Sequence, residues 1–243
     1  MNSFNRLGFF SSMPPVVKNL IIINVLMLLA SFINEHFVIE HFALYYPGSP
    51  LFKPHQLVTH IFVHGGTFHL LFNMYALWLF GCALENQWSG KKFLLFYLVT
   101  GIGAALFYSL VLWLQVWHIE SQIDTATLVQ MKDLLHNGQV FIDRSPDMQQ
   151  WLSVMTTPMV GASGAVYGVL LGFGMLYPNA VLQFIFPPVS LKAKWLVVIY
   201  ASLELLLGLM NSGGNIAHFA HVGGMLFGFL LIKYWKHKGN MYA

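Results

Sequence analysis

The chain alternates between long apolar stretches and short polar connections over almost its full length. Windows of about twenty apolar residues, enough to cross the hydrocarbon core of a bilayer, occur near residues 16–34, 57–82, 94–117, 159–177, 194–210 and 216–235. No long polar tail flanks these windows, so we expect residues 1–243 to form a single membrane domain. The pattern predicts an all-α polytopic membrane protein with six transmembrane helices.

The composition agrees with a membrane location. The chain is 57% hydrophobic and 9% charged, whereas ordinary soluble domains carry roughly 25% charged residues. The net charge of +3 is small and its basic residues are scattered, which argues against a nucleic-acid partner. The single cysteine, Cys82, excludes an intramolecular disulfide and any multi-cysteine metal site.

Basic residues set the predicted orientation. Six spans place both termini on the same side of the membrane. On that side lie Arg6, Lys18, Lys91, Lys92, Lys192, Lys194, Lys233, Lys236 and Lys238, and on the other only Lys53, Lys132 and Arg144. The positive-inside rule therefore places both termini in the cytoplasm. The first span lacks a small-residue cleavage site, so we read it as a retained signal anchor, and we expect a bacterial inner (cell) membrane location.

The stretch at 118–157 is an extracytoplasmic insert between the third and fourth spans. Its segment from Thr125 to Leu135 has apolar residues at helical spacing, which predicts a short helix lying on the membrane surface. A poorly ordered polar loop fits the composition equally well. A second outer connection, at 211–215, contains two glycines and is predicted to be a short flexible loop.

Chemically unusual residues lie near the outer ends of spans two, four and six: His69 and Asn73, Ser163, and His221. Ser163 and His221 would each lie on the order of 5–10 Å below the start of their helices. Small residues repeat at every fourth position beside both of them, at Gly164, Gly168 and Gly172 and at Ala220, Gly224 and Gly228. Such stripes let two helix backbones approach closely, so we expect the serine and the histidine to meet.

A serine beside a histidine predicts nucleophilic chemistry. Serine is a poor nucleophile until a base removes its proton, and histidine suits that task near neutral pH. The only carboxylate within a predicted span is Glu204, near the middle of the fifth. We therefore expect a pair without an acid and a structural role for Glu204, at a depth below the site. Tyr167, one turn below Ser163, would lie against the imidazole or serve only in helix packing.

Acyl transfer also needs donors for the developing oxyanion. His69 and Asn73 are spaced i, i+4, so both side chains leave one face of the second span. If Gly161 delays the start of the fourth helix, the N–H of Ser163 is an unpaired donor as well. If that helix begins at Thr157-Pro158, the same N–H is already bonded within the helix. The sequence leaves both starts open.

These residues resemble the rhomboid family of intramembrane serine proteases over positions 52–228. Gly161-Ala162-Ser163-Gly164 resembles its nucleophile motif, His69-Leu70-Leu71-Phe72-Asn73 its oxyanion helix, and Ala220-His221-Val222-Gly223-Gly224 with Gly228 its base motif. The resemblance implies Ser163 as nucleophile, His221 as general base, His69 and Asn73 as oxyanion donors, and Tyr167, Gly161 and Gly164 as supporting residues. It further implies a six-helix rhomboid bundle, an active site open to the extracytoplasmic side, transmembrane protein substrates within the lipid bilayer, and neither cofactor nor metal. The first outer loop, 35–56, lacks the Trp-Arg pair of many relatives, and the insert at 118–157 lies outside the common pattern.

Two other classes of protein could use the same residues. A histidine-ligated membrane metalloenzyme could use His218-x-x-His221 or His60-x-x-x-His64, but no His-Glu-x-x-His helix occurs and we expect no carboxylate beside these histidines. His60, His64 and His218 then read as interfacial or hydrogen-bonded structural residues. A transporter would line a path with Asn73, Ser163 and Glu204. These residues gather at one end and do not span the predicted depth.

Overall fold

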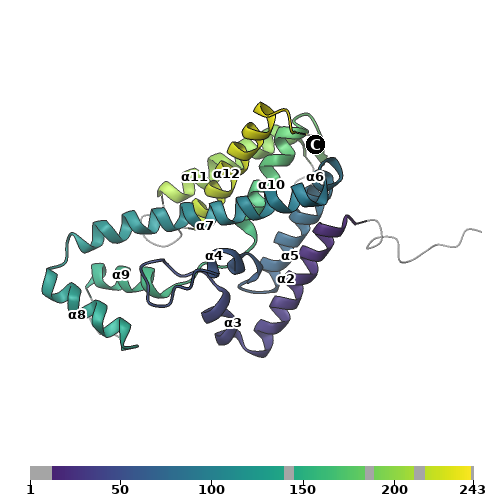
Figure 1. The fold of residues 1–243 in the computed structure, drawn as a ribbon. Helices are drawn as coiled ribbons and strands as arrows, with labels where there is room; N and C mark the ends of the chain where they lie inside the picture. The colour runs from purple at the N-terminus through teal and green to yellow at the C-terminus, as the bar shows by residue number, and fades with distance from the viewer. Residues whose placement is uncertain (1–12, 140–144, 184–188, 211–216, 242–243) are drawn as a thin grey trace, which may run out of the picture.

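A computed structural model describes residues 13–139, 145–183, 189–210 and 217–241, which are mostly helical (Figure 1). In chain order the elements are α2 (Pro15–Ile33), α3 (Glu35–Phe42), α4 (Gln56–Thr59), η1 (His60–Phe62), α5 (Thr67–Ala76), η2 (Leu77–Gly81), α6 (Cys82–Gln87), α7 (Gly90–Glu120), α8 (Thr125–His136), α9 (Pro146–Thr156), α10 (Ser163–Leu176), β1 (Val181–Gln183), β2 (Ser190–Lys192), α11 (Ala193–Met210) and α12 (Ala217–His237). Strands β1 and β2 form a small antiparallel pair between α10 and α11 that the sequence did not predict. The predicted outer loop at 211–215 lies outside the described residues.

The protein is a polytopic α-helical membrane protein. Four helical segments of the described chain are long and apolar enough to cross a bilayer: Pro15–Ile33, Thr67–Gln87, Gly90–Glu120 and Ala193–Met210. Helix α10 is apolar but has only 14 residues. Helix α12 has 21 residues and carries three histidines and two lysines that lower its hydropathy. The predicted multi-pass helical class is confirmed.

The second predicted span, 57–82, is wrong at both ends. The apolar residues at its start form α4 and η1, and α5 begins only at Thr67, after Gly66 with φ of 141°. The segment then runs through the π-helical turn η2 and continues to Gln87. Much of this first part is buried within the protein: Ile61 and Val63 are fully buried and His60 is 2% exposed. Nδ1 of His60 lies 2.9 Å from the carbonyl oxygen of Gln56. Burial lowers the pKa of His60 to about 4, so the ring is neutral at pH 7.

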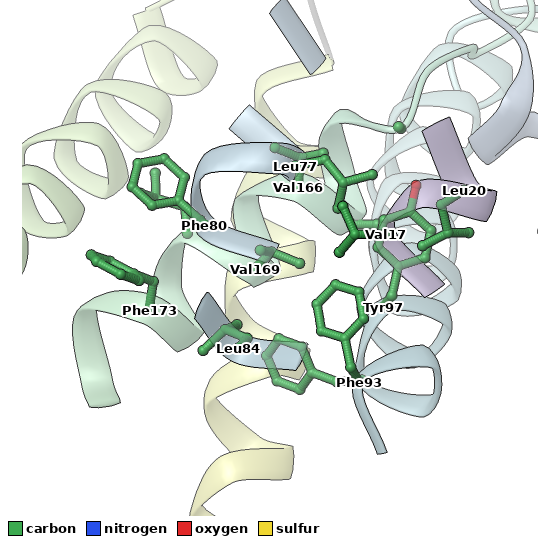
Figure 2. Close-up of a cluster of buried hydrophobic side chains, with 14 of the residues drawn as sticks. Val17, Leu20, Leu77, Phe80, Leu84, Phe93, Tyr97, Val166, Val169 and Phe173 are labelled. Carbon is green, nitrogen blue, oxygen red and sulfur yellow. The ribbon is translucent and has the colours of Figure 1, made fainter. Parts of the chain in front are cut away.

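The main core lies where α2, η2, α6, α7 and α10 meet (Figure 2). Val17, Leu77, Leu84, Phe93 and Val169 each come from a different one of these elements, and each is fully buried. Their side chains point toward one another in Figure 2. In a membrane this contact gives mainly van der Waals packing, since lipid tails are as apolar as the core itself. The cluster therefore packs α7 directly against α10 and joins α2 to them through η2 and α6.

Helix α2 is fixed at its start by a buried carboxylate. Glu85 of α6 is 5% exposed, and it accepts hydrogen bonds from the backbone N–H groups of Val16 at 2.9 Å and Val17 at 2.7 Å. These N–H groups belong to the first helical turn, where they have no partner inside the helix. The positive end of the helix dipole adds to the attraction. Glu85 thus ties the first helix to the rest of the bundle.

The described parts of the insert, 118–139 and 145–157, are mostly helical and pack against α7. The predicted helix from Thr125 is confirmed as α8, and Oδ1 of Asp124 caps it by accepting a bond from Thr127 N at 3.0 Å. Met131 of α8 and Trp151 of α9 are buried against α7, which extends beyond the predicted span to Glu120. Glu120 Oε1 accepts from Trp151 Nε1 at 3.1 Å and lies 2.9 Å from Lys132 Nζ. These contacts join α8 and α9 at one end of α7 (Figure 1).

Replacing Glu85 with alanine should destabilise the protein without changing its membrane class. The substitution leaves two first-turn N–H groups buried without an acceptor, and hydrogen bonds to charged groups contribute roughly 1.5–3 kcal/mol each. We expect a loss of about 2–4 kcal/mol, measured as a lower thermal midpoint in detergent. Glu35→Ala is the matched control, because Glu35 also lies in the first turn of a helix but is exposed. Equal midpoints for the two variants would contradict this account of α2.

Replacing Trp151 with alanine should loosen the insert selectively. Truncating a buried tryptophan typically costs about 3–5 kcal/mol, and Trp151 is 1% exposed. Hydrogen exchange should accelerate in α8 and α9 and stay unchanged in α10 and α12. Trp117→Ala, which removes a 65% exposed ring from α7, should leave both regions protected. Unchanged protection of α8 in the Trp151 variant would show that the insert does not depend on this core.

Candidate active site

The fold brings together the serine and the histidine that the sequence singled out. Ser163 is the first residue of α10, and His221 lies in the second turn of α12. The Oγ atom of Ser163 lies 2.8 Å from Nε2 of His221, within hydrogen-bond distance. Both side chains are only partly exposed. The hydroxyl can therefore donate its proton directly to the ring nitrogen.

Close backbone contact between α10 and α12 makes this distance possible. A Cβ atom added at Gly224 would overlap the carbonyl oxygen of Gly164, and one added at Gly228 would lie 3.4 Å from the carbonyl oxygen of Gly168. The stripe on α12 thus faces α10, as expected. The stripe on α10 is different, because Cβ atoms at Gly164 and Gly168 would meet side chains of α7 instead. The glycines of α10 therefore allow α7 to pack closely, and the glycines of α12 allow α10 to pack closely.

Gly161 sets the start of α10. Its φ of 122° is in the region that favours glycine, and its N–H donates to the carbonyl oxygen of His60 at 3.0 Å. The bond that opens the helix runs from Val166 N to the oxygen of Ala162, at 2.9 Å, so the N–H of Ser163 lies in the unpaired first turn. The sequence left open two starting points for this helix. The one at Thr157-Pro158 is wrong, because Thr157 instead caps the end of α9.

His69 and Asn73 lie on the wall of the same cavity as Ser163 and His221. The N–H of Gly65 donates to Nδ1 of His69 at 3.4 Å, which places the ring proton on Nε2. A Cβ atom at Gly161 would lie 2.9 Å from that Nε2 and 3.7 Å from Ser163 Oγ, so only a glycine-sized gap separates the two groups. Asn73 uses one amide N–H to bond the oxygen of His69 at 2.9 Å and keeps its second N–H.

The cavity has a volume of about 430 Å³ and lies between α5, α10, α11 and α12. Its polar end is formed by the residues just described. The remaining wall is apolar or aromatic and comprises Phe72, Tyr75, Ala76, Leu79, Phe80, Val166, Leu170, Leu196 and Tyr200. Such a chamber fits an apolar side chain beside a polar reaction centre.

Tyr167 stacks on the imidazole of His221. The ring centroids are 4.1 Å apart and the planes differ by 7°. Tyr200 of α11 meets Tyr167 edge-on at 6.0 Å. Tyr167 is therefore a direct neighbour of the histidine and not only a helix-packing residue. The contact fixes the plane of the imidazole.

The expectation of a pair without an acidic neighbour is wrong. Glu204 of α11 is 7% exposed, and its Oε2 lies 2.9 Å from Nδ1 of His221 and 2.6 Å from Nδ1 of His218. Its Oε1 accepts a short hydrogen bond from the hydroxyl of Tyr167. The sequence contained a usable signal: Glu204 and His221 lie at similar distances from the predicted loop at 211–215, so antiparallel helices would place them at similar depth.

The same cluster overturns the expectation that no carboxylate accompanies the histidines. The ligating atoms of Glu204, His218 and His221 all lie within 4.8 Å of one another, the one such group among the described residues. His64 lies elsewhere, 3% exposed, with its ring edge-on to His69 at 5.0 Å. Burial lowers the pKa of His64 to about 4, so this ring is neutral at pH 7.

Comparison with known proteins finds one matching family model and several relatives that carry the name rhomboid. A family model described as "Eukaryotic integral membrane protein (DUF1751)" matches residues 18–242. RHOMBOID-like protein 12, mitochondrial, of Arabidopsis thaliana is 26% identical over 212 residues, covering 86% of this chain and 55% of the relative. Rhomboid protein 1, mitochondrial, of Saccharomyces cerevisiae is 26% identical, covering 72% and 40%. Rhomboid protease AarA of Providencia stuartii is 27% identical, covering 70% and 51%.

The chain thus spans about half the length of the curated relatives it matches. Two of the three relatives are mitochondrial by name, so the predicted bacterial inner membrane has no support from them. All three names share one family, which agrees with the motifs around Ser163 and His221.

Substituting alanine for Gly161 should disable the site while the bundle stays folded. The new Cβ would lie 2.8 Å from Cε1 of His69 and would strain a backbone at positive φ. We expect labelling of Ser163 by a fluorophosphonate probe to fall at least ~10-fold, in a protein that still folds with a modestly lower thermal midpoint. Gly66→Ala is the control, because Gly66 also has positive φ but nothing lies within 4 Å of its Cβ position. Equal labelling of both variants would contradict the requirement for space beside His69.

Proposed function

Because the chain belongs to the rhomboid family and to the integral membrane family DUF1751, we propose that it is an intramembrane serine endopeptidase. It hydrolyses a peptide bond in or near the transmembrane segment of membrane-anchored proteins. The observation that carries the proposal is the 2.8 Å contact between Ser163 Oγ and His221 Nε2 inside a cavity of the membrane domain. A hydroxyl on a neutral imidazole is the arrangement that activates serine for acyl transfer.

The reaction begins when Ser163 Oγ attacks the carbonyl carbon of the scissile bond and His221 Nε2 takes the hydroxyl proton. The carbonyl oxygen becomes an oxyanion, and the donors available to it are His69 Nε2–H, the second amide N–H of Asn73, and the N–H of Ser163. Collapse of this intermediate breaks the C–N bond, and His221 gives its proton to the leaving nitrogen. The products are a new amino terminus and an ester on Ser163.

Water completes the cycle. His221 removes a proton from a water molecule, which attacks the ester carbonyl carbon. The second oxyanion collapses, the carboxylic acid product leaves, and the proton returns to Ser163. No step needs a metal or another cofactor.

The short length of α10 provides a route for that water. At 1.5 Å per residue, the 14 residues of α10 span about 21 Å, less than the roughly 30 Å of a bilayer core. If α10 and α12 serve as spans four and six, with both termini on the basic, cytoplasmic side, the missing length of α10 lies above Ser163. The site then opens to the opposite side of the membrane, which the insert also occupies.

The cavity also indicates what kind of substrate fits. Its apolar wall accommodates one apolar side chain next to the scissile bond. A helical segment must unwind before its backbone can reach Ser163, because a helix holds its carbonyl groups in internal hydrogen bonds. The substrates are therefore membrane proteins with small or helix-weakening residues near the outer surface.

A histidine-ligated metallohydrolase is the second candidate, favoured by the convergence of Glu204, His218 and His221. A divalent ion there would bind the Nδ1 atoms of both histidines, which suits zinc. The serine at Nε2 of His221 has no part in such a mechanism. A transporter has less support, because Asn73, Ser163 and Glu204 gather around one cavity and do not line a path through the bundle.

Fluorophosphonate labelling separates these functions. The detergent-solubilised wild-type protein should be labelled, and Ser163→Ala and His221→Ala should each lose at least ~99% of the labelling rate. Ser109→Ala, which removes a buried serine from α7, should label normally. A chelator should have no effect. Labelling that persists in Ser163→Ala would refute the serine mechanism, and labelling or hydrolysis abolished by chelator would favour the metal-dependent candidate.

A further inference from the structure

The proposed reaction leaves one buried carboxylate beside the site without a role. Glu204 comes from α11, whereas Ser163 and His221 come from α10 and α12. A carboxylate buried among apolar helices is costly unless donors surround it. Three side chains approach it: Tyr167 at Oε1, and His218 and His221 at Oε2. An ionised carboxylate only accepts, and each of these groups can donate.

The three contacts differ in quality. The contacts from the Tyr167 hydroxyl and from Nδ1 of His218 have hydrogen-bond geometry. Nδ1 of His221 is only 2.9 Å from Oε2, but its N–H direction does not align with that oxygen. The interaction of Glu204 with His221 is therefore a close charge contact, and Tyr167 and His218 hold the carboxylate in place.

Resting on the proposed serine mechanism, we propose that Glu204 is an acidic positioning residue for His221, which makes the site a Ser163–His221–Glu204 triad. A carboxylate at Nδ1 favours the tautomer with its proton on that atom. Nε2 is then left unprotonated and ready to accept the proton of Ser163. The negative charge also stabilises the imidazolium that forms during attack.

Tyr167 serves this arrangement in two ways. Its ring stacks on the imidazole at 4.1 Å, while its hydroxyl binds the carboxylate that faces the ring edge. The imidazole of His221 is thus held on its face from α10, at Nδ1 from α11 and at Nε2 by Ser163. Helix α11 thus takes part in the chemistry, because its displacement would move the carboxylate of Glu204 away from His221.

A purely structural Glu204 makes a different prediction. Glutamine has nearly the same shape: its oxygen can accept from one of Tyr167 and His218, and its amide nitrogen can donate to the hydroxyl oxygen or ring nitrogen of the other. It therefore preserves packing and removes the charge. A structural role therefore tolerates Glu204→Gln, and a positioning role does not. Glu85→Gln is the matched control: Glu85 is also buried, at 5% exposure, but it bonds the start of α2.

The experiment measures the rate of fluorophosphonate labelling against pH for wild type, Glu204→Gln, Glu204→Asp and Glu85→Gln. The titratable groups that face His221 are Tyr167, Glu204, His218 and, across the cavity, His69. We expect Glu204→Gln to label about 100-fold more slowly, less than the ~10⁴-fold loss of an aligned triad acid. Its half-maximal rate should also move to lower pH, because an imidazolium without a neighbouring anion loses its proton more readily.

The conservative variants complete the test. Glu204→Asp should recover part of the rate and restore the wild-type pH midpoint, whereas Glu85→Gln should lower thermal stability and leave both rate and midpoint unchanged. A Glu204→Gln protein with the wild-type rate and midpoint would overturn the proposal. If that variant does not fold, the double variant Tyr167→Phe, His218→Phe decides: it keeps the ring stacked on His221 and removes both side chains that hold the carboxylate, so an unchanged rate and midpoint would equally overturn the proposal.

Two further measurements distinguish a failure of the Glu204 proposal from a failure of the proposed serine mechanism. If Ser163→Ala labels like wild type, the serine mechanism itself fails, whatever Glu204 does. Addition of zinc or of a chelator should leave the Glu204→Gln to wild-type rate ratio unchanged. A wild-type rate that depends on zinc and falls to the Glu204→Gln level with chelator would assign the carboxylate to a metal ion instead of to His221.

Discussion

The contact between the backbones of α10 and α12 is the constraint on which the rest of the site depends. No side chain fits between Gly164 and Gly224, so the two helices approach to a distance that only glycines allow. Ser163 directly precedes Gly164, and His221 lies one turn before Gly224. Their 2.8 Å contact is therefore a consequence of helix packing. A methyl group at Gly224 would overlap the backbone of Gly164 and push α12 away from α10, which would separate Ser163 from His221.

Two further elements complete this arrangement from outside the helix pair. Gly161 holds the chain in an extended turn beside His69, so that α10 begins at Ser163 with its first N–H groups unpaired. Helix α11 brings Glu204 to the opposite edge of the imidazole. The proposed oxyanion donors thus lie on the Ser163 side of the pair and the carboxylate lies beside His221, an arrangement that suits the separation of charge in the proposed attack.

The sequence predicted those parts of the protein that depend on local pattern. Helices α2 and α11 agree with their predicted spans because only a few polar residues interrupt their apolar runs. Ser163 and His221 were singled out because polar residues are rare at such depth. The second span failed because the apolar residues near His60 form only the short helices α4 and η1, which do not continue into α5. Glu204 was placed apart from the site because depth along one helix does not show which residues of a neighbouring helix lie opposite.

The central claim is that Ser163 is the activated nucleophile of a membrane protease. Its most direct test is peptide mapping of the folded, fluorophosphonate-treated protein by mass spectrometry. The account predicts one phosphonylated residue, Ser163, with the modification lost when His221 is replaced by alanine. A modification at another residue such as Ser109, or none in a folded protein with an intact cavity, would contradict it.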